Sequence, residues 1–158
     1  MTQEEIERAA ERLIKEANRK STVKKRQYDE ECYAEECRAA ERRAARSSIL
    51  ENILGRLKTE FDDAVALIQS ELDEKLEELY EKGDGGSGGG SDPGGGEDAP
   101  YEVDYSLPMR ERYITVRDYY LAYEDKQQAL ADFREDEIAQ DYLGSYYSYV
   151  LQLLMTMV

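Results

Sequence analysis

The side chains of this sequence that could do chemistry are mainly carboxylates and tyrosines, and histidine is missing. The 158 residues include 36 Asp and Glu, 13 Tyr, 2 Cys and no His. Without histidine, the chain lacks the usual general base near neutral pH and the commonest metal ligand. Acidic pairs such as Glu30–Glu31 and Asp62–Asp63 lie in charged helical stretches, which predicts solvated helix faces. We therefore expect no enzyme, no catalytic residue, no cofactor and no metal site.

The two cysteines, Cys32 and Cys37, are five residues apart. On an α-helix this separation turns about 140° around the axis, so the thiols point to different faces. They cannot readily bridge each other or chelate one metal. We expect free thiols of a reduced compartment, with an intermolecular disulfide as the alternative.

A glycine-rich stretch, Gly83–Gly96, divides the chain and contains nine of its eleven glycines. Such a run behaves as a flexible coil with an rms span of about 20 Å. A phosphate-binding loop would need a GK[ST] ending, and no lysine lies inside this run. We interpret residues 83–98 as a tether, either natural or engineered, between a module at 1–82 and a module at 99–158.

The first module reads as charged helix. Thr2 and Glu5 form a capping-box pattern that places a helix start at the N-terminus. The apolar stripe lapses at residues 18–22, where Ser21 or Thr22 could cap a second helix, so a break is expected there. Residues 23–82 contain no proline and one glycine. They predict a single helix about 90 Å long.

The strongest apolar stripe lies in the second half of this module and is coiled-coil-like. Additional apolar residues such as Leu67 widen the face, so this helix should meet more than one neighbour. We expect either an ordinary helical bundle or a parallel self-associating coiled coil. The residues predicted to mediate protein contacts are Leu50, Leu54, Leu57, Phe61, Ile68, Leu72, Leu76 and Leu79.

The second module combines an extended arm with a tyrosine-rich helical hairpin. Alternating residues at 99–105 predict the arm. Helices are expected over 108–134 and from Ile138 onward, with a turn at 134–137. Gly144 predicts a kink or a close approach of another backbone. Tyrosines are enriched where proteins meet, although an ordinary core of half-buried tyrosines is the alternative. The predicted contact residues here are Tyr113, Tyr120, Tyr142, Tyr146, Tyr149 and Leu153.

Charge narrows the set of partners. The chain carries a net charge of −15, with −5 in residues 1–82 and −10 in residues 83–158. Acidic surface argues against nucleic acid and against anionic membranes. No apolar run is long enough to span a bilayer. The acidic N-terminus does not resemble a signal peptide. We expect a cytoplasmic or virion-associated protein whose partner is another protein or a second copy.

These observations predict an all-α, elongated protein with a structural, scaffolding or adaptor function. The layout is one that small virion or assembly proteins of tailed phages could use, which is an analogy of layout only. The alternative is a single-chain fusion of a small helical binding module and its helical partner. Because the tether is short, the C-terminal helices should pack on the half of the long helix that carries Leu50–Leu79.

Overall fold

The computed structural model describes residues 2–43, 47–83 and 99–158. These residues form six α-helices and one short 3-10 helix, and they contain no strand. The predicted all-α class is therefore confirmed. The predicted tether lies, except for Gly83, outside the described residues.

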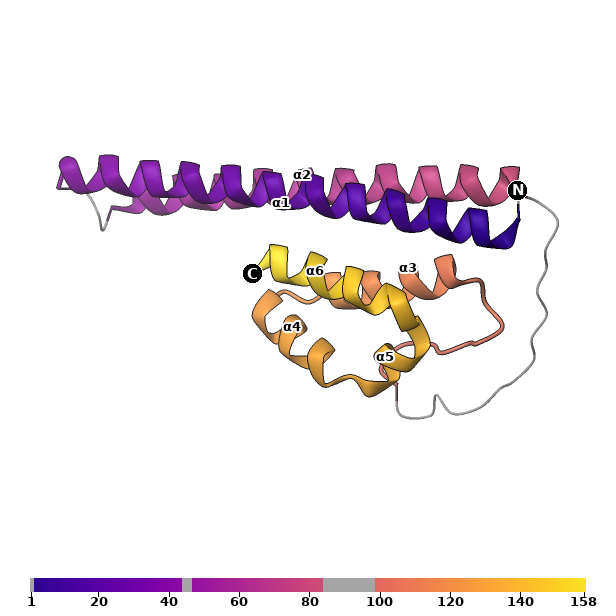
Figure 1. Ribbon diagram of the computed structural model, residues 1–158. Helices are drawn as coiled ribbons and strands as arrows, with labels where there is room; N and C mark the ends of the chain where they lie inside the picture. Colours follow the sequence, from indigo (N-terminus) through magenta and orange to yellow (C-terminus); the bar gives the residue numbers. More distant parts are fainter. Residues whose placement is uncertain (1, 44–46, 84–98) are drawn as a thin grey trace.

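Two long helices, α1 (Gln3–Glu41) and α2 (Ser48–Lys82), lie side by side as an antiparallel hairpin (Figure 1). The prediction of one continuous helix through residues 23–82 is wrong. Helix α1 ends at Glu41 with Arg42 as its C-cap, and Arg43 has a positive φ of 55°. Ser47 then starts α2 by accepting a hydrogen bond from the Leu50 amide at 3.2 Å. Folding back lets the apolar stripe of α2 pack against α1 instead of facing water.

The N-terminal half of α1 confirms one local prediction and contradicts another. The capping box is present, because Thr2 and Glu5 exchange side-chain and backbone hydrogen bonds. The break expected at 18–22 is wrong, since α1 runs through it. The hydroxyls of Ser21 and Thr22 donate to carbonyls four residues earlier, at 3.1 and 2.9 Å. These residues therefore bond back into the helix and do not cap a new one.

The C-terminal module has more helices than expected. It contains α3 (Met109–Leu121), α4 (Lys126–Glu135), α5 (Glu137–Leu143), the 3-10 helix η1 (Gly144–Tyr146) and α6 (Tyr147–Met157). The prediction of a two-helix hairpin is wrong because each expected helix is divided, the first before Asp125 and the second at Gly144. Asp125 starts α4, and Asp136 starts α5. The expected turn at 134–137 is confirmed at Asp136.

Gly144 separates α5 from α6. Its φ of 53° and ψ of −121° are accessible to glycine and strained for other residues. A Cβ added there would meet nothing within 4 Å. The predicted kink is therefore confirmed, and the alternative of a close backbone approach is wrong. The segment expected as an extended arm has no helix between residues 99 and 108, and it buries Tyr101.

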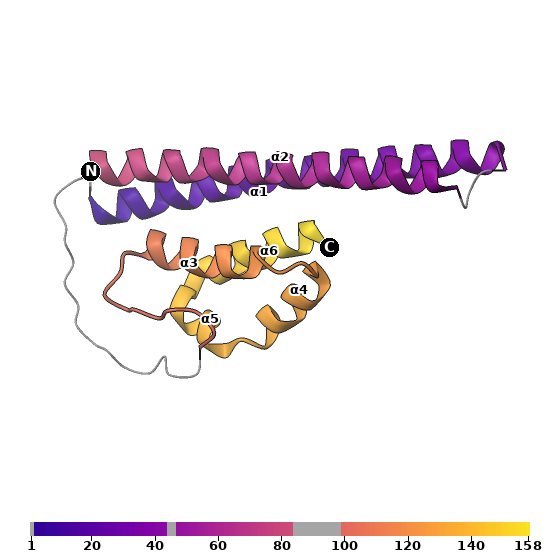
Figure 2. The same cartoon turned by 180° about the vertical axis from the view of Figure 1, so that it is seen from behind.

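The C-terminal helices lie along one side of the hairpin, beside the half that contains the N-terminus (Figure 2). The tip of the hairpin extends beyond them. The expectation that these helices pack on the Leu50–Leu79 half holds for Ile68, Leu72 and Leu76. They also pack on the first half of α1, which a straight helix would have kept out of reach. The hairpin brings the two ends together, so that Gly83 lies against Ile6.

Candidate protein-interaction surfaces

One apolar core joins the hairpin to the C-terminal module. Small residues at Ala10 and Ala17 of α1 allow α6 to approach the hairpin closely. Fully burying one large aliphatic side chain stabilises a fold by about 1.5–3 kcal/mol. Several such side chains are shared here, so the two modules form one packed unit. The shared core includes Ile14, Ile68, Leu72, Leu76, Tyr113, Val116, Tyr120, Tyr142, Tyr146, Val150 and Leu154.

The residues predicted to contact a partner are mostly covered by the chain itself. Those that are buried are Leu50, Leu57, Phe61, Ile68, Leu72, Leu76, Tyr113, Tyr120, Tyr142, Tyr146 and Leu153. Leu54, Leu79 and Tyr149 are partly exposed. The structure brings the middle of the leucine stripe and four of these tyrosines into one core, while Phe61 joins Leu153 in a smaller cluster. Leu50, Leu54 and Leu57 lie farther along the hairpin toward its tip.

A buried arginine connects α3 to α2 inside this interface. Arg117 is 2% exposed and donates two hydrogen bonds to the Asp73 carboxylate, at 2.7 and 2.8 Å. Asp118 accepts a further bond at 2.8 Å, and Gln69 accepts one at 3.4 Å. Burial opposes the charge, but the bond to Asp73 and the nearby negative groups outweigh it and raise the pKa of Arg117. The side chain therefore stays charged and fixes the modules in register.

Asn18 makes a second polar connection between the modules. It is 1% exposed, and its side-chain amide donates to the Tyr149 carbonyl of α6 at 3.0 Å. The Gln152 side chain accepts a longer bond at 3.4 Å. A buried amide placed against another helix selects one alignment of the two helices, because a shifted alignment would leave it unpaired.

Asp136 organises the arm and α5 within the C-terminal module. One carboxylate oxygen accepts from the Tyr101 and Tyr120 hydroxyls, at 2.8 and 2.7 Å. The other oxygen accepts from the Ala139 amide at 2.9 Å and caps α5. Burial and the bond to Asp136 raise the pKa values of both tyrosines. This carboxylate is thus committed to structure.

Two tyrosine hydroxyls at the module interface, those of Tyr113 and Tyr146, are buried without a hydrogen-bond partner among the described residues. Burial raises the pKa of Tyr113 to about 12, and burial also raises the pKa of Tyr146. The two rings meet edge to face, with centroids 6.0 Å apart. These tyrosines contribute mainly apolar area and aromatic contact.

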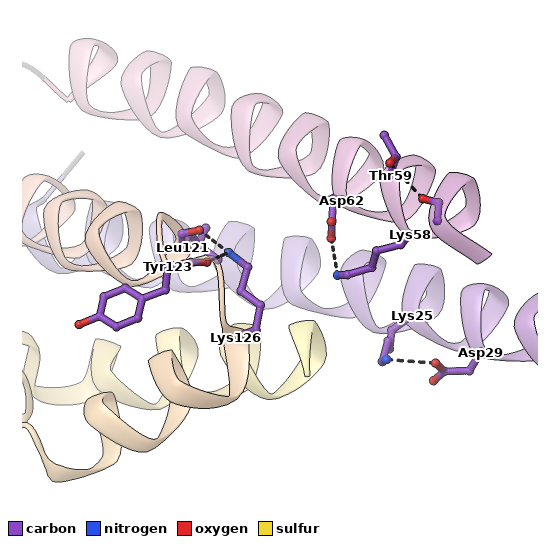
Figure 3. Close-up of polar contacts among 9 residues, drawn as sticks. Lys25, Asp29, Lys58, Thr59, Asp62, Leu121, Tyr123 and Lys126 are labelled. Carbon is purple, nitrogen blue, oxygen red and sulfur yellow. Dashed lines mark hydrogen bonds and ion pairs between the residues drawn. The ribbon is translucent and has the colours of Figure 1, made fainter. Parts of the chain in front are cut away.

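Three lysines near the end of α6 are already engaged, as Figure 3 shows. Lys25 and Lys58 each pair with an aspartate four residues later, at 3.0 and 2.7 Å. Lys126 donates to the Leu121 carbonyl and, at 2.6 Å, to the Tyr123 carbonyl at the end of α3. Burial lowers the pKa of Lys126. The contacts are those of a helix C-terminus and its neighbours, not of an open anion site.

A groove of about 590 Å³ runs between α1 and α2 away from the C-terminal module. All the residues that line it come from these two helices. Its apolar residues include Leu67, which is 62% exposed, and Val23, which is 43% exposed. Ala64 and Ile68 also line it. Of the predicted contact residues, Ile68 alone lines this groove. Leu67 was noted in the sequence only as widening the stripe of α2.

Comparison with protein-family models, with curated proteins and with solved structures finds no match. Among the described residues, no group of three or more His, Cys, Asp or Glu side chains could hold a metal ion. No helix in the described part of the chain has the length and apolar character needed to cross a membrane.

Proposed function

We propose that this protein is a non-enzymatic scaffold or adaptor. In this proposal the C-terminal module holds one end of the helical hairpin, and the opposite face of the hairpin receives a helical surface of a protein. The observation that carries the proposal is the exposed pair Val23 and Leu67 in a groove that the C-terminal helices leave uncovered. Apolar side chains gathered in an exposed groove with a charged border are typical of protein-interaction sites.

The polar groups of the shared core support a structural role over a catalytic one. Arg117 and the half-buried Asp136 each make several polar contacts with other segments of the chain. Both use these contacts to connect helices and the arm. The groove itself is lined by surface lysine, arginine and glutamate side chains around an apolar floor. This composition suits protein contact.

The test is a comparison of two variants in affinity capture from cells that express the natural protein. Leu67→Glu places a charge in the groove, whereas Tyr33→Glu changes a side chain that is 69% exposed and outside the groove-lining set. Binding that is lost in Leu67→Glu and retained in Tyr33→Glu supports the proposal. Equal retention in both variants contradicts it, because the bound protein would then use another surface. A virion role is the narrower form of this proposal and requires the chain to be retained in purified phage particles.

The extent of the module interface favours a second candidate function, a binding module fused to its helical target. The C-terminal helices bury Tyr113, Tyr146 and Leu154 against the hairpin, as one partner buries another. A protease site inserted within residues 84–98 would allow cleavage of the folded protein. Fragments that stay together in gel filtration, and rebind after separation, support this candidate. Fragments that unfold when cleaved contradict it.

A further inference from the structure

The groove between α1 and α2 has a basic border and an acidic border. On the α1 side, residues 19–26 contain five Lys or Arg and no Asp or Glu. Arg19, Lys20 and Lys24 from this segment line the groove, together with Glu16 just before it. On the α2 side, Glu71 lines the same groove; toward the tip, the neighbouring pocket is lined by Glu60 of α2 and Glu31 of α1. Glu16 pairs with Lys20 on the same border at 3.1 Å, so the α1 border is mixed but net basic, whereas the α2 border is acidic at Glu71.

We propose that the occupant of this groove is a second copy of this chain, with the two hairpins face to face and parallel. The proposal rests on the proposed function and names the partner. A two-fold axis parallel to the helices would place α1 of each copy over α2 of the other at the same height. Val23 of one copy then meets Leu67 of the second, and Lys20 meets Glu71. Interfaces with two-fold symmetry repeat every contact twice.

Charge selects this arrangement over an antiparallel one. In an antiparallel pair, α1 would lie over α1, and the basic segment at 19–26 would face its own copy. Like charges placed opposite each other across an interface disfavour a wrong alignment. The parallel pair brings basic borders onto acidic borders at both edges of the groove. It also uses the apolar floor formed by Val23, Ala64, Leu67 and Ile68.

The distribution of net charge permits the same arrangement. The residues after the hairpin carry −10 of the total −15. The C-terminal helices lie along one side of the hairpin (Figures 1 and 2), and none of the residues that line the groove belongs to them. A face-to-face pair would therefore keep the two acidic modules on the outside, where solvent and salt screen their repulsion.

The first test is a charge exchange measured by light scattering over a wide range of concentration. In the proposed pair, residue 20 of each copy faces residue 71 of the other. Lys20→Glu alone or Glu71→Lys alone therefore makes both of these contacts repulsive. Each variant should weaken association about tenfold, on the scale of a few exposed ion pairs. An equimolar mixture should recover association, because both contacts become attractive in the mixed pair. Tyr33→Glu is the matched control and should leave association unchanged.

The second test reports the direction of the helices by disulfide trapping. In a chain whose native thiols are removed by Cys32→Ser and Cys37→Ser, one preparation carries Val23→Cys and another carries Leu67→Cys. The parallel pair predicts efficient cross-linking only when the two preparations are mixed. Cross-linking within the Val23→Cys preparation alone would instead indicate the antiparallel pair and overturn the proposal.

The two proposals fail in different ways. A chain that stays monomeric at every concentration, with no mixed cross-link, overturns the second-copy proposal. The adaptor proposal would then still stand if capture depends on Leu67. If neither self-association nor capture depends on the groove, both proposals fail.

Discussion

Replacing Asp73 by alanine should destabilise the protein by about 3 kcal/mol, because it leaves the buried Arg117 without its main partner. Arg117 is 2% exposed and donates two short hydrogen bonds to the Asp73 carboxylate. Removing one partner of a buried ion pair typically costs about 3–5 kcal/mol. The Asp73 side chain is 34% exposed, and Asp118 remains 2.7 Å from the guanidinium and retains part of the pairing. We therefore expect the lower end of this range.

The measurement is urea unfolding followed by helical circular dichroism, with the free energy of unfolding obtained by linear extrapolation. The matched control is Asp62→Ala, which removes a half-exposed pair with Lys58. Pairs of that kind contribute about 0.2–1 kcal/mol. A chain carrying both Asp73→Leu and Arg117→Met should recover most of the lost stability, since apolar groups can replace a buried ion pair. If Asp73→Ala costs no more than Asp62→Ala, Arg117 does not connect the modules in the way argued above.

Three further outcomes follow from local geometry. Asp136→Ala should cost more than Asp125→Ala, by about 1–3 kcal/mol in urea unfolding, because both remove a helix cap but only Asp136 also accepts from two tyrosine hydroxyls. Burial raises the pKa of Tyr113 to about 12. The folded state therefore favours the neutral Tyr113 hydroxyl. This contribution to the free energy of unfolding is fully present below the unfolded pKa of about 10 and is lost as the pH rises through about 12. Unfolding measured across this alkaline range should show the decline; constant stability would contradict it. Gly55→Ala, in an open position inside α2, should raise stability by about 0.5–1 kcal/mol, while Gly144→Ala should lower it by about 1–3 kcal/mol in thermal unfolding.

Short-range signals predicted much of the secondary structure. The capping box at Thr2 and the kink at Gly144 depend on side-chain and backbone chemistry within a few residues, so they could be read directly. The aspartate caps of α4 and α5 carried the same kind of signal. The turn at Asp136 was predicted, but Asp125 lies in a polar stretch that resembles continuous helix, which is why the division of residues 108–134 into α3 and α4 was not predicted.

The reversal at residues 42–47 could not be predicted from local preference. Alanine and long charged residues favour helix on both sides of it. The polar segment at 18–22 was an equally plausible break, but Ser21 and Thr22 instead bond back to the carbonyls of α1. The choice between these positions depends on which hairpin buries more apolar area, and that depends on the whole chain.

The sequence predicted that apolar and tyrosine side chains would mediate protein contacts, but it did not predict which of them would remain exposed. The leucine stripe and the tyrosines were expected to meet a partner, and most of them pack against each other within one chain. Pairing Arg117 with Asp73 joins residues that are 44 positions apart, and nothing in either local sequence indicates the other. Exposure of Val23 and Leu67 likewise follows from which face of the hairpin the C-terminal helices cover.

By itself, the sequence determined that the protein is helical, acidic and divided into two modules of different composition. Helix periodicity, caps and charge act over a few residues and need no contact with distant segments. These properties could therefore be predicted from the sequence. The tertiary structure decided where the long helix folds back, which stripes are buried and which groove remains open. Those outcomes depend on burying apolar surface between segments that are distant in sequence, and only the folded chain brings them together.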